Sequence, residues 1–251
     1  MATSIDRVYQ KVLVFANKEQ RGYITPQEFN LFADQAQMEI FEQYFYDINQ
    51  WTRQHGNDHE YSDMLVNLEE KIDKLTHIAI GDNVTVLNQY GDINLNDDLS
   101  ELYRLGSIRV KYPGKGYKTA EEMRSRKEFA LYESSPLTKR VEERPIYLRY
   151  TTTSGDDRIK IYPYPTVGSD CTYHVQVDYI RKPNVPNWGY VVINDKALYN
   201  STSSTNFELH PSEESELVYR ILAYAGIAIE KPQLTQMAGA LGQGQIQQEK
   251  Q

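Results

Sequence analysis

Residues 17–28 have the side-chain types and the spacing of a calcium-binding EF-hand loop. Loop positions 1, 3, 5, 6, 7, 9 and 12 fall on Asn17, Glu19, Arg21, Gly22, Tyr23, Thr25 and Glu28. Calcium takes about six to eight oxygen ligands, most of them anionic, and the loop ends in a bidentate Glu. Here Arg21, a permanent cation, stands at a ligand position, and the sequence holds no second copy of the motif. The loop therefore lacks part of the chemistry that calcium needs.

The same residues also contain a capping box, which marks the start of a helix. Thr25 is the cap, Pro26 takes the first helical position and Glu28 follows three residues after the cap. Gly22 can supply the backbone turn before it. We therefore interpret residues 17–28 as the corner between two helices, and we expect no metal there. A calcium-binding module stays the alternative from another functional class.

No other segment of the sequence carries a complete catalytic or ligand-binding motif. His55, Asp58, His59 and Glu60 could supply metal ligands, but Gly56-Asn57 favours a solvated loop. YPGKGYKT lacks the spacing of a phosphate loop, and GALGQGQ follows no strand, as a dinucleotide site requires. Cys171 lies in an expected strand and is interpreted as a packed thiol. We expect no catalytic, cofactor or metal site, and no enzyme.

Composition favours a globular protein assembled in a reducing compartment. The 251 residues include one Cys, too few for an internal disulfide, and no apolar run of membrane-spanning length or signal-peptide pattern. The formal charge of −8 argues against a surface that binds nucleic acid everywhere. The 20 Tyr against 2 Trp favour protein–protein contacts, because a tyrosine can be buried in an interface and keep a polar tip.

Apolar residues recur at helical spacing near both ends of the chain. This periodicity predicts helices over residues 4–17, 26–52, 63–75 and 212–230. A short helical or turn segment is expected from Asp97 to Gly106. A second capping box at Thr119–Glu122 predicts a helix to about Tyr132.

Alternating apolar and polar residues predict strands in the middle of the chain. SIRVKY, near 107–112, is one of them, and from Pro145 three runs with short polar turns predict an antiparallel meander. NWGYVVIN can add a short strand. We therefore predict an α+β fold, in which a helical body of N-terminal and C-terminal helices carries an inserted antiparallel β meander. Its expected parts are a mainly helical body (1–144), a β region (145–209), a C-terminal helix (210–232) and a Gln- and Gly-rich tail (233–251).

Six segments of the sequence, spread over most of residues 1–232, resemble a known family in combination. They are GYITPQEFNLFADQAQMEIFEQYF, LYRLGSIRV, SPLTKRVEERPIYLRY, IKIYPYP, VQVDYIRKPNVPNWGY and FELHPSEESELVYRILAYAGIAI, in this order. The set resembles virion structural proteins of short-tailed double-stranded DNA phages, notably the crAss-like gut phages. Those proteins look like head-to-tail adaptors, or ring proteins, stacked beneath the portal.

The resemblance implies a homo-oligomeric ring of commonly about twelve copies, placed at the head–tail junction of the virion. Its partners would be the portal protein and neighbouring ring or tail proteins. DNA would pass through the lumen without sequence-specific binding, and no membrane or cofactor would take part. Another virion component, such as a stopper, a tail hub or a minor capsid protein, stays open as an alternative.

The segment RKPNVPNWGY and the tail are the expected contact regions of such a ring. Pro183 and Pro186 stiffen an extended segment, and Trp188 and Tyr190 are aromatic residues of the kind that anchor interfaces. Gln236, Gln245 and Gln247 are the expected contacts in the tail. The alternative for Trp188 is that it packs within its own chain.

Overall fold

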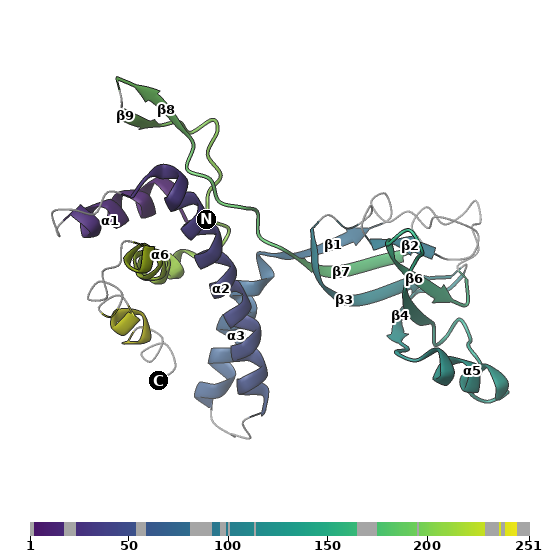
Figure 1. Ribbon diagram of the computed structural model, residues 1–251. Helices are drawn as coiled ribbons and strands as arrows, with labels where there is room; N and C mark the ends of the chain where they lie inside the picture. The colour runs from purple at the N-terminus through teal and green to yellow at the C-terminus, as the bar shows by residue number, and fades with distance from the viewer. Residues whose placement is uncertain are drawn as a thin grey trace. The chain divides into compact units, whose positions relative to one another are not determined.

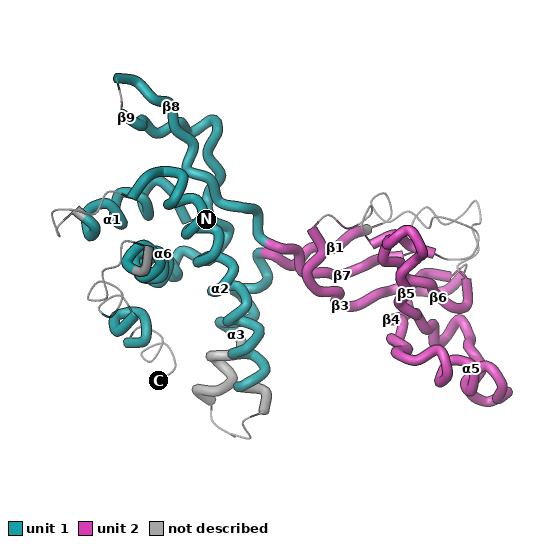
Figure 2. The backbone as a smooth tube through the Cα atoms, in the orientation of Figure 1, with its two compact units in different colours: residues 1–74, 183–251 teal, residues 75–182 magenta. Residues whose placement is uncertain are grey.

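The computed structural model of the chain describes residues 3–17, 24–53, 59–80, 92–95, 99, 101–112, 114–164, 175–194, 196–228, 236 and 239–244. The chain divides into two compact units (Figure 2): a helical unit of residues 1–74 and 183–251, and an inserted unit of residues 75–182. The fold class is α+β, as predicted, since helices from both ends of the chain form one unit and a mainly antiparallel sheet forms the other (Figure 1).

The helical unit is built from four of the described helices. These are α1 (Ile5–Asn17), α2 (Pro26–Arg53), α3 (His59–Asp73) and α6 (Glu214–Ala228). Helices α1, α2 and α6 each bury one apolar stripe, α3 buries Ile72, and α6 packs against both α1 and α2. The main buried side chains are Ile5, Val8 and Val12 of α1, Phe29, Ala33, Ile40 and Phe41 of α2, Ile72 of α3, and Leu217, Ile221 and Ala225 of α6. Among the described helices, none has the length and apolar character that crossing a membrane requires.

Helix α2 begins at the predicted capping box. The Glu28 backbone N–H donates to Thr25 Oγ1 at 3.3 Å, and the Thr25 backbone N–H donates to Glu28 Oε2 at 2.9 Å. Hydrogen bonds from the backbone and hydroxyl of Thr25 lower the pKa of the Glu28 carboxyl, because they stabilise its ionised form. The prediction of a helix start at Thr25–Glu28 is therefore confirmed.

Ion pairs attach the first turns of α6 and the turn before it to the other helices. Arg220 contacts Glu216 Oε1 at 2.5 Å and Glu39 Oε2 of α2 at 2.9 Å. Lys71 of α3 lies 2.6 Å from Glu213, whose side chain is buried. Burial raises the pKa of the Glu216 carboxyl, and the Arg220 charge opposes that shift. The register of α6 on α2 thus depends on partly buried charges as well as on apolar contacts.

The inserted unit is a seven-stranded sheet with the strand order β1-β7-β3-β4-β5-β6-β2. Its strands are β1 (Thr76–Ile80), β2 (Asp92–Asn94), β3 (Leu102–Lys111), β4 (Tyr117–Glu122), β5 (Ile146–Thr151), β6 (Asp157–Tyr162) and β7 (Val175–Arg181). All neighbours run antiparallel except β4 and β5. Residues that alternate along the strands, such as Ile108, Val110, Ile159, Ile161 and Val177, form its core.

The predicted helix from Thr119 is wrong, because residues 117–122 form strand β4. Ala120 is buried and pairs with Ile108 of β3, whereas Glu121 pairs with Ile146 of β5. A helix does follow, but later: α5 (Arg126–Ser134) begins at Ser125, whose hydroxyl accepts the Lys127 N–H at 3.2 Å. Pairing on both edges of β4 outweighed the local capping signal.

The predicted segment from Asp97 to Gly106 and the predicted meander also differ from the structure. Strand β3 begins at Leu102 and continues through Gly106, where its register on β7 shifts. A Cβ on Gly106 would come within 2.8 Å of the Asp178 carbonyl oxygen, so glycine permits this close approach. Strand β7 pairs with β1 and β3 and not with β6, so only β5 and β6 form the expected hairpin. The unit boundaries accordingly lie at Leu75 and Lys182, whereas the sequence divided the chain at residues 144 and 209.

Candidate interaction surfaces

A β-hairpin of the helical unit forms a sheet of its own. It consists of β8 (Tyr190–Ile193) and β9 (Lys196–Tyr199), and Figure 1 shows it extending beyond the helices of its unit. Its paired residues are Tyr190 with Tyr199, Val191 with Leu198, Val192 with Ala197, and Ile193 with Lys196. A hairpin of two strands is marginally stable in water by itself. Its surroundings therefore decide whether it holds one conformation.

Trp188 fixes the hairpin to the helices. Its side chain is buried, and its ring centroid lies 4.2 Å from that of Tyr9 on α1 and 5.8 Å from that of Tyr190. The indole Nε1 donates to Asp6 Oδ1 at 3.0 Å. The amide of Asn30 on α2 accepts the Trp188 backbone N–H at 2.8 Å and donates to the Trp188 carbonyl at 3.4 Å. The base of the hairpin is thus held by both α1 and α2.

The segment before Trp188 is also held within the helical unit. Pro183 and Pro186 are buried, and Gln37 of α2, which is fully buried, donates to the Asn184 carbonyl at 2.9 Å. Gln37 Oε1 in turn accepts the Glu208 backbone N–H at 3.2 Å. Pro183, Pro186 and the Asn184 backbone are therefore held by the protein's own helices, whereas the side chain of Val185 is exposed.

Beyond its base the hairpin exposes apolar side chains on both faces. Since paired residues share a face, one face carries Val191, Ile193 and Leu198 and the other Val192 and Tyr199. Their exposed fractions are 48% for Val191, 61% for Val192, 52% for Ile193, 50% for Leu198 and 39% for Tyr199. A hairpin on a protein surface ordinarily has one polar face. Two apolar faces on a firmly held element make the hairpin a candidate contact surface.

The structure thus places the predicted contact residues in different environments. Pro183, Pro186 and Trp188 pack inside their own unit, which agrees with the alternative for Trp188, and Tyr190 is half-buried. Gln236 is exposed and helical, whereas Gln245 and Gln247 lie outside the described residues. The predicted segment is adjacent to the exposed surface, but the exposed side chains follow it. Their sequence signal was the run YVVI, which, unlike a half-buried strand, does not alternate with polar residues.

A second exposed apolar surface lies on the inserted unit, in and after α5. Helix α5 buries none of its side chains, and the exposed fractions are 70% for Leu131 and 96% for Leu137. Phe129 and Arg140 hold the segment against β6, with the Phe129 ring 4.7 Å and the Arg140 guanidinium 4.9 Å from the Tyr162 ring centroid. This α5 segment is a further candidate for contact with another protein.

The charges of the protein are divided unevenly between the units. Residues 75–182 hold 16 Lys and Arg against 15 Asp and Glu, whereas the helical unit holds 11 against 20. A cleft of about 740 Å³ in the inserted unit is lined by four arginines, namely Arg104, Arg124, Arg149 and Arg158. Arg149 is paired with Glu122 at 2.9 Å and Arg158 with Asp156 at 3.3 Å. Ion pairs within the unit thus offset the positive charge of at least Arg149 and Arg158.

We predicted no metal site, and the structure describes only some of the residues that this prediction concerns. Within the described ranges there is no group of three or more His, Cys, Asp or Glu side chains that could hold a metal ion. Residues 18–23 of the calcium-like loop, and His55, Asp58 and Cys171, lie outside those ranges. The sequence matches no protein-family model and no curated protein.

Proposed function

We propose that this chain is a structural protein of a phage virion, which forms a homo-oligomeric ring below the portal, joins capsid to tail and encloses the DNA channel. The β8–β9 hairpin carries the proposal. A firmly held element with two apolar faces is suited to contact between subunits, because its burial contributes roughly 25 cal/mol for each Å² of apolar surface removed from water. The family resemblance, which covers most of residues 1–232, supplies the virion context.

The distribution of charge supports the proposed passage of DNA. The excess of acidic residues lies in the helical unit, where 20 Asp and Glu face 11 Lys and Arg. A lumen lined by such a unit would repel phosphate groups, whereas a basic lumen would release counterions and retain the DNA. In this proposal the ring needs neither a cofactor nor a catalytic residue, since its role is to hold neighbouring proteins together.

Light scattering after size exclusion, together with negative-stain images, tests the ring directly. The protein should form rings of uniform copy number, either alone or once the portal protein is added as a template. A matched pair of variants tests the role of the hairpin. Val191→Thr with Leu198→Thr keeps β-propensity and should abolish assembly without lowering the melting temperature, whereas Leu31→Thr, on the exposed side of α2, should assemble normally. A protein that stays monomeric in both conditions would contradict the proposal.

The position in the particle separates an adaptor ring from the alternative virion components. Gold-labelled antibody on intact virions should mark the junction just below the portal. Label on the capsid surface or at the distal end of the tail would instead assign the chain to a minor capsid protein or a tail hub.

Removal of residues 236–251 should leave folding intact, and it should weaken docking to the portal if this tail reaches a neighbouring protein.

A further inference from the structure

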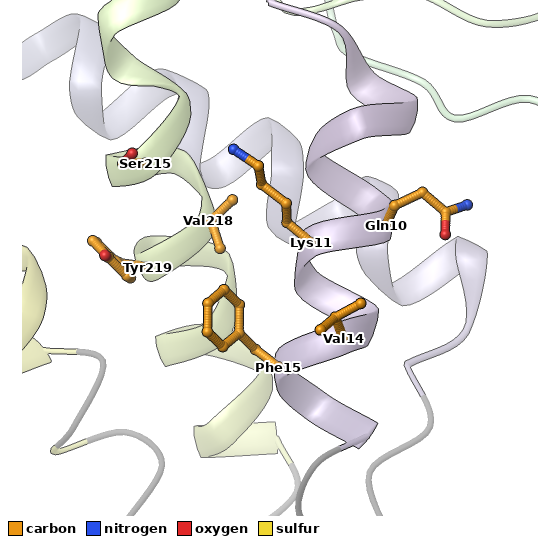
Figure 3. A pocket seen from close by; sticks show the side chains of 7 residues that line it. All are labelled: Gln10, Lys11, Val14, Phe15, Ser215, Val218 and Tyr219. Carbon is orange, nitrogen blue, oxygen red and sulfur yellow. The ribbon is translucent and has the colours of Figure 1, made fainter.

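Two clefts of the protein differ in the ligands that their side chains could bind. The cleft of the helical unit lies between α1 and α6 (Figure 3) and has a volume of about 440 Å³. Lys11 is the one charged residue among the described residues that line it, and it already contacts Glu214 at 2.7 Å. The cleft of the inserted unit is lined by Arg104, Arg124, Arg149 and Arg158. Of the two, the second is the one that gathers charged groups able to select a ligand.

Four neighbouring strands supply the arginines of this cleft, one from each strand. Arg104 lies near the start of β3, Arg149 in β5 and Arg158 in β6, and Arg124 follows the end of β4 by two residues. The pairing of β4 with β5 continues to the residue before Arg124, because the N–H of that residue donates to a carbonyl of β5 at 2.9 Å. Adjacent strands of a sheet are about 4.8 Å apart, so arginines on two of them can contact one ligand together.

The lining of this cleft carries an excess of positive charge. Two carboxylates also line it, Glu122 and Asp157, so the described lining residues have two more positive than negative groups. The pair of Arg149 with Glu122 joins two partly exposed side chains at 2.9 Å, and such a pair contributes little that a ligand would have to replace. Arg158 Nε is buried and has no hydrogen-bond acceptor in the part of the chain that the structure describes. Buried donors without an acceptor are rare in proteins, and a ligand oxygen in the cleft would supply one.

Part of the cleft is apolar and aromatic. Leu95 and Leu105 line it and are buried in the core of the inserted unit, and Leu102, which also lines it, packs against that core. Two tyrosines complete this part, Tyr103, which is exposed, and Tyr150, which is half-buried. The volume of about 740 Å³ lies in the range of about 300–1,000 Å³ that is usual for small-molecule sites. A lone inorganic anion would therefore leave the apolar part of the cleft unfilled.

We propose that this cleft binds a nucleotide, either free or as part of a single nucleic-acid strand. A carboxylate presents two oxygens, which one guanidinium group matches, whereas a phosphate presents more acceptors and can contact guanidinium groups from two strands at once. The sugar and base would cover the leucines, and Tyr103 and Tyr150 are side chains of the kind on which bases stack. The inference concerns the inserted unit and goes beyond the proposed ring, which rests on the hairpin.

Binding of phosphate probes to the full-length protein tests this site. In titration calorimetry dAMP should bind, and inorganic phosphate should bind about tenfold more weakly, because it leaves the tyrosines without a base to stack on. Fluorescence anisotropy measures the affinity for a labelled oligothymidylate. An affinity for this strand about tenfold above that for dAMP would identify a nucleic-acid strand as the ligand, and equal affinities would identify a free nucleotide. Inorganic phosphate that binds as tightly as dAMP, or a DNA duplex that binds more tightly than the single strand, would overturn the inference.

A matched pair of variants places the binding in the cleft. Arg124 is exposed, so Arg124→Gln should keep the melting temperature and should weaken dAMP and the strand by about tenfold, as expected for a hydrogen bond between charged groups. Arg124→Lys keeps the charge without the planar fork and should restore only part of the affinity. Arg144→Gln removes the same charge from an exposed position outside the cleft and should bind like the unaltered protein. Equal affinities of Arg124→Gln and Arg144→Gln, no binding of dAMP or strand at millimolar concentration, or tighter binding of a glutamate-rich peptide would overturn the inference and leave the proposed ring standing.

Discussion

The indole Nε1 of Trp188 lies 3.0 Å from the Asp6 carboxylate, although 182 residues separate them in the chain. This hydrogen bond connects the base of the β8–β9 hairpin with the first turn of α1. Asp6 also lies where a negative charge favours a helix, because the N-terminal N–H groups are partly positive. One carboxylate thus serves the start of α1 and the orientation of the hairpin.

Replacement of Trp188 by alanine should destabilise the protein strongly. The side chain is buried against Tyr9, so the change leaves a cavity and should cost about 3–5 kcal/mol of unfolding free energy. Trp188→Phe keeps most of the ring contact and should lose less. Urea unfolding followed by circular dichroism measures both. A Trp188→Ala variant with an unchanged midpoint would show that the indole does not stabilise the fold.

Thr25→Ala should cost about 1 kcal/mol, since it removes the cap of α2. Glu28→Gln should be mild, because Gln can still reach back to the Thr25 N–H. Thr25→Ser is the matched control and should unfold like the unaltered protein.

Calorimetric titration of the protein with calcium should show no binding. A micromolar affinity that disappears in Glu28→Gln would establish a calcium loop at residues 17–28.

Arg220→Met should cost about 3–5 kcal/mol at neutral pH, because it leaves the buried Glu216 carboxylate without its cation. Burial already raises the pKa of Glu216 and the variant loses the opposing charge, so the folded state binds a proton more readily than the unfolded state. Stability then falls as pH rises above the unfolded pKa of about 4.3. The loss of unfolding free energy in Arg220→Met, relative to the unaltered protein, should therefore be smaller at pH 5 than at pH 8. Adding Glu216→Gln should remove this pH dependence. An equal loss at both pH values would contradict the role given to Glu216.

His210 should make the protein less stable in mild acid. Its Nδ1 accepts the Ser212 N–H at 3.3 Å, and burial lowers its pKa, as do the charges of Lys74 and Lys71. The folded state therefore favours the neutral ring, and its contribution is present above the unfolded pKa of about 6.5 and lost as pH falls through the folded value. His210→Asn keeps a capping acceptor without titrating, so its unfolding midpoint should fall less between pH 7.5 and 5.5. Parallel curves for the two proteins would contradict this role.

Helices α1 and α6 could be predicted from the sequence because each has its own apolar stripe. Val8 and Val12 of α1, or Leu217 and Ile221 of α6, repeat at helical spacing whatever they pack against. The strand partners could not be predicted in this way. Strand β7 has the expected alternation, yet it pairs with β1 and β3, which lie about 100 and 70 residues before it in the chain. Alternation identifies a strand but not its neighbour.

The predicted contact segment lies beside the exposed apolar hairpin, but Pro183, Pro186 and Trp188 are themselves buried. Pro183, Pro186 and Trp188 have the composition of an interface anchor, but a sequence does not show which way an aromatic side chain faces. The burial of Trp188 depends on Tyr9 and Asn30, which are far away in the chain.

The letters TAEE at residues 119–122 fit both a helix cap and a strand, and only the pairing of β4 with β3 and β5 decides between them.

Gly189, at the base of the hairpin, should not tolerate even alanine. A Cβ there would lie 2.7 Å from the carbonyl carbon of Ser203, closer than real Cβ atoms approach backbone. The Gly189 N–H also donates to Ser204 Oγ at 3.0 Å, and its carbonyl accepts the Asn200 N–H at 2.8 Å, so the two segments cannot move apart without losing both bonds. Gly189→Ala should therefore lower the melting temperature by several degrees, about 1–3 kcal/mol as for other overpacked sites.

Two further variants show whether this close approach is the cause. Gly116→Ala, where a Cβ would meet no atom within 4 Å, should leave the melting temperature unchanged. Adding Ser203→Ala to Gly189→Ala removes the hydroxyl beside the new methyl group but not the backbone carbonyl, so it should restore little stability. If the double variant recovered fully, the hydroxyl alone would be the obstacle, and the backbone at Ser203 would be free to move. In that case the hairpin base would be less rigid than its hydrogen bonds indicate.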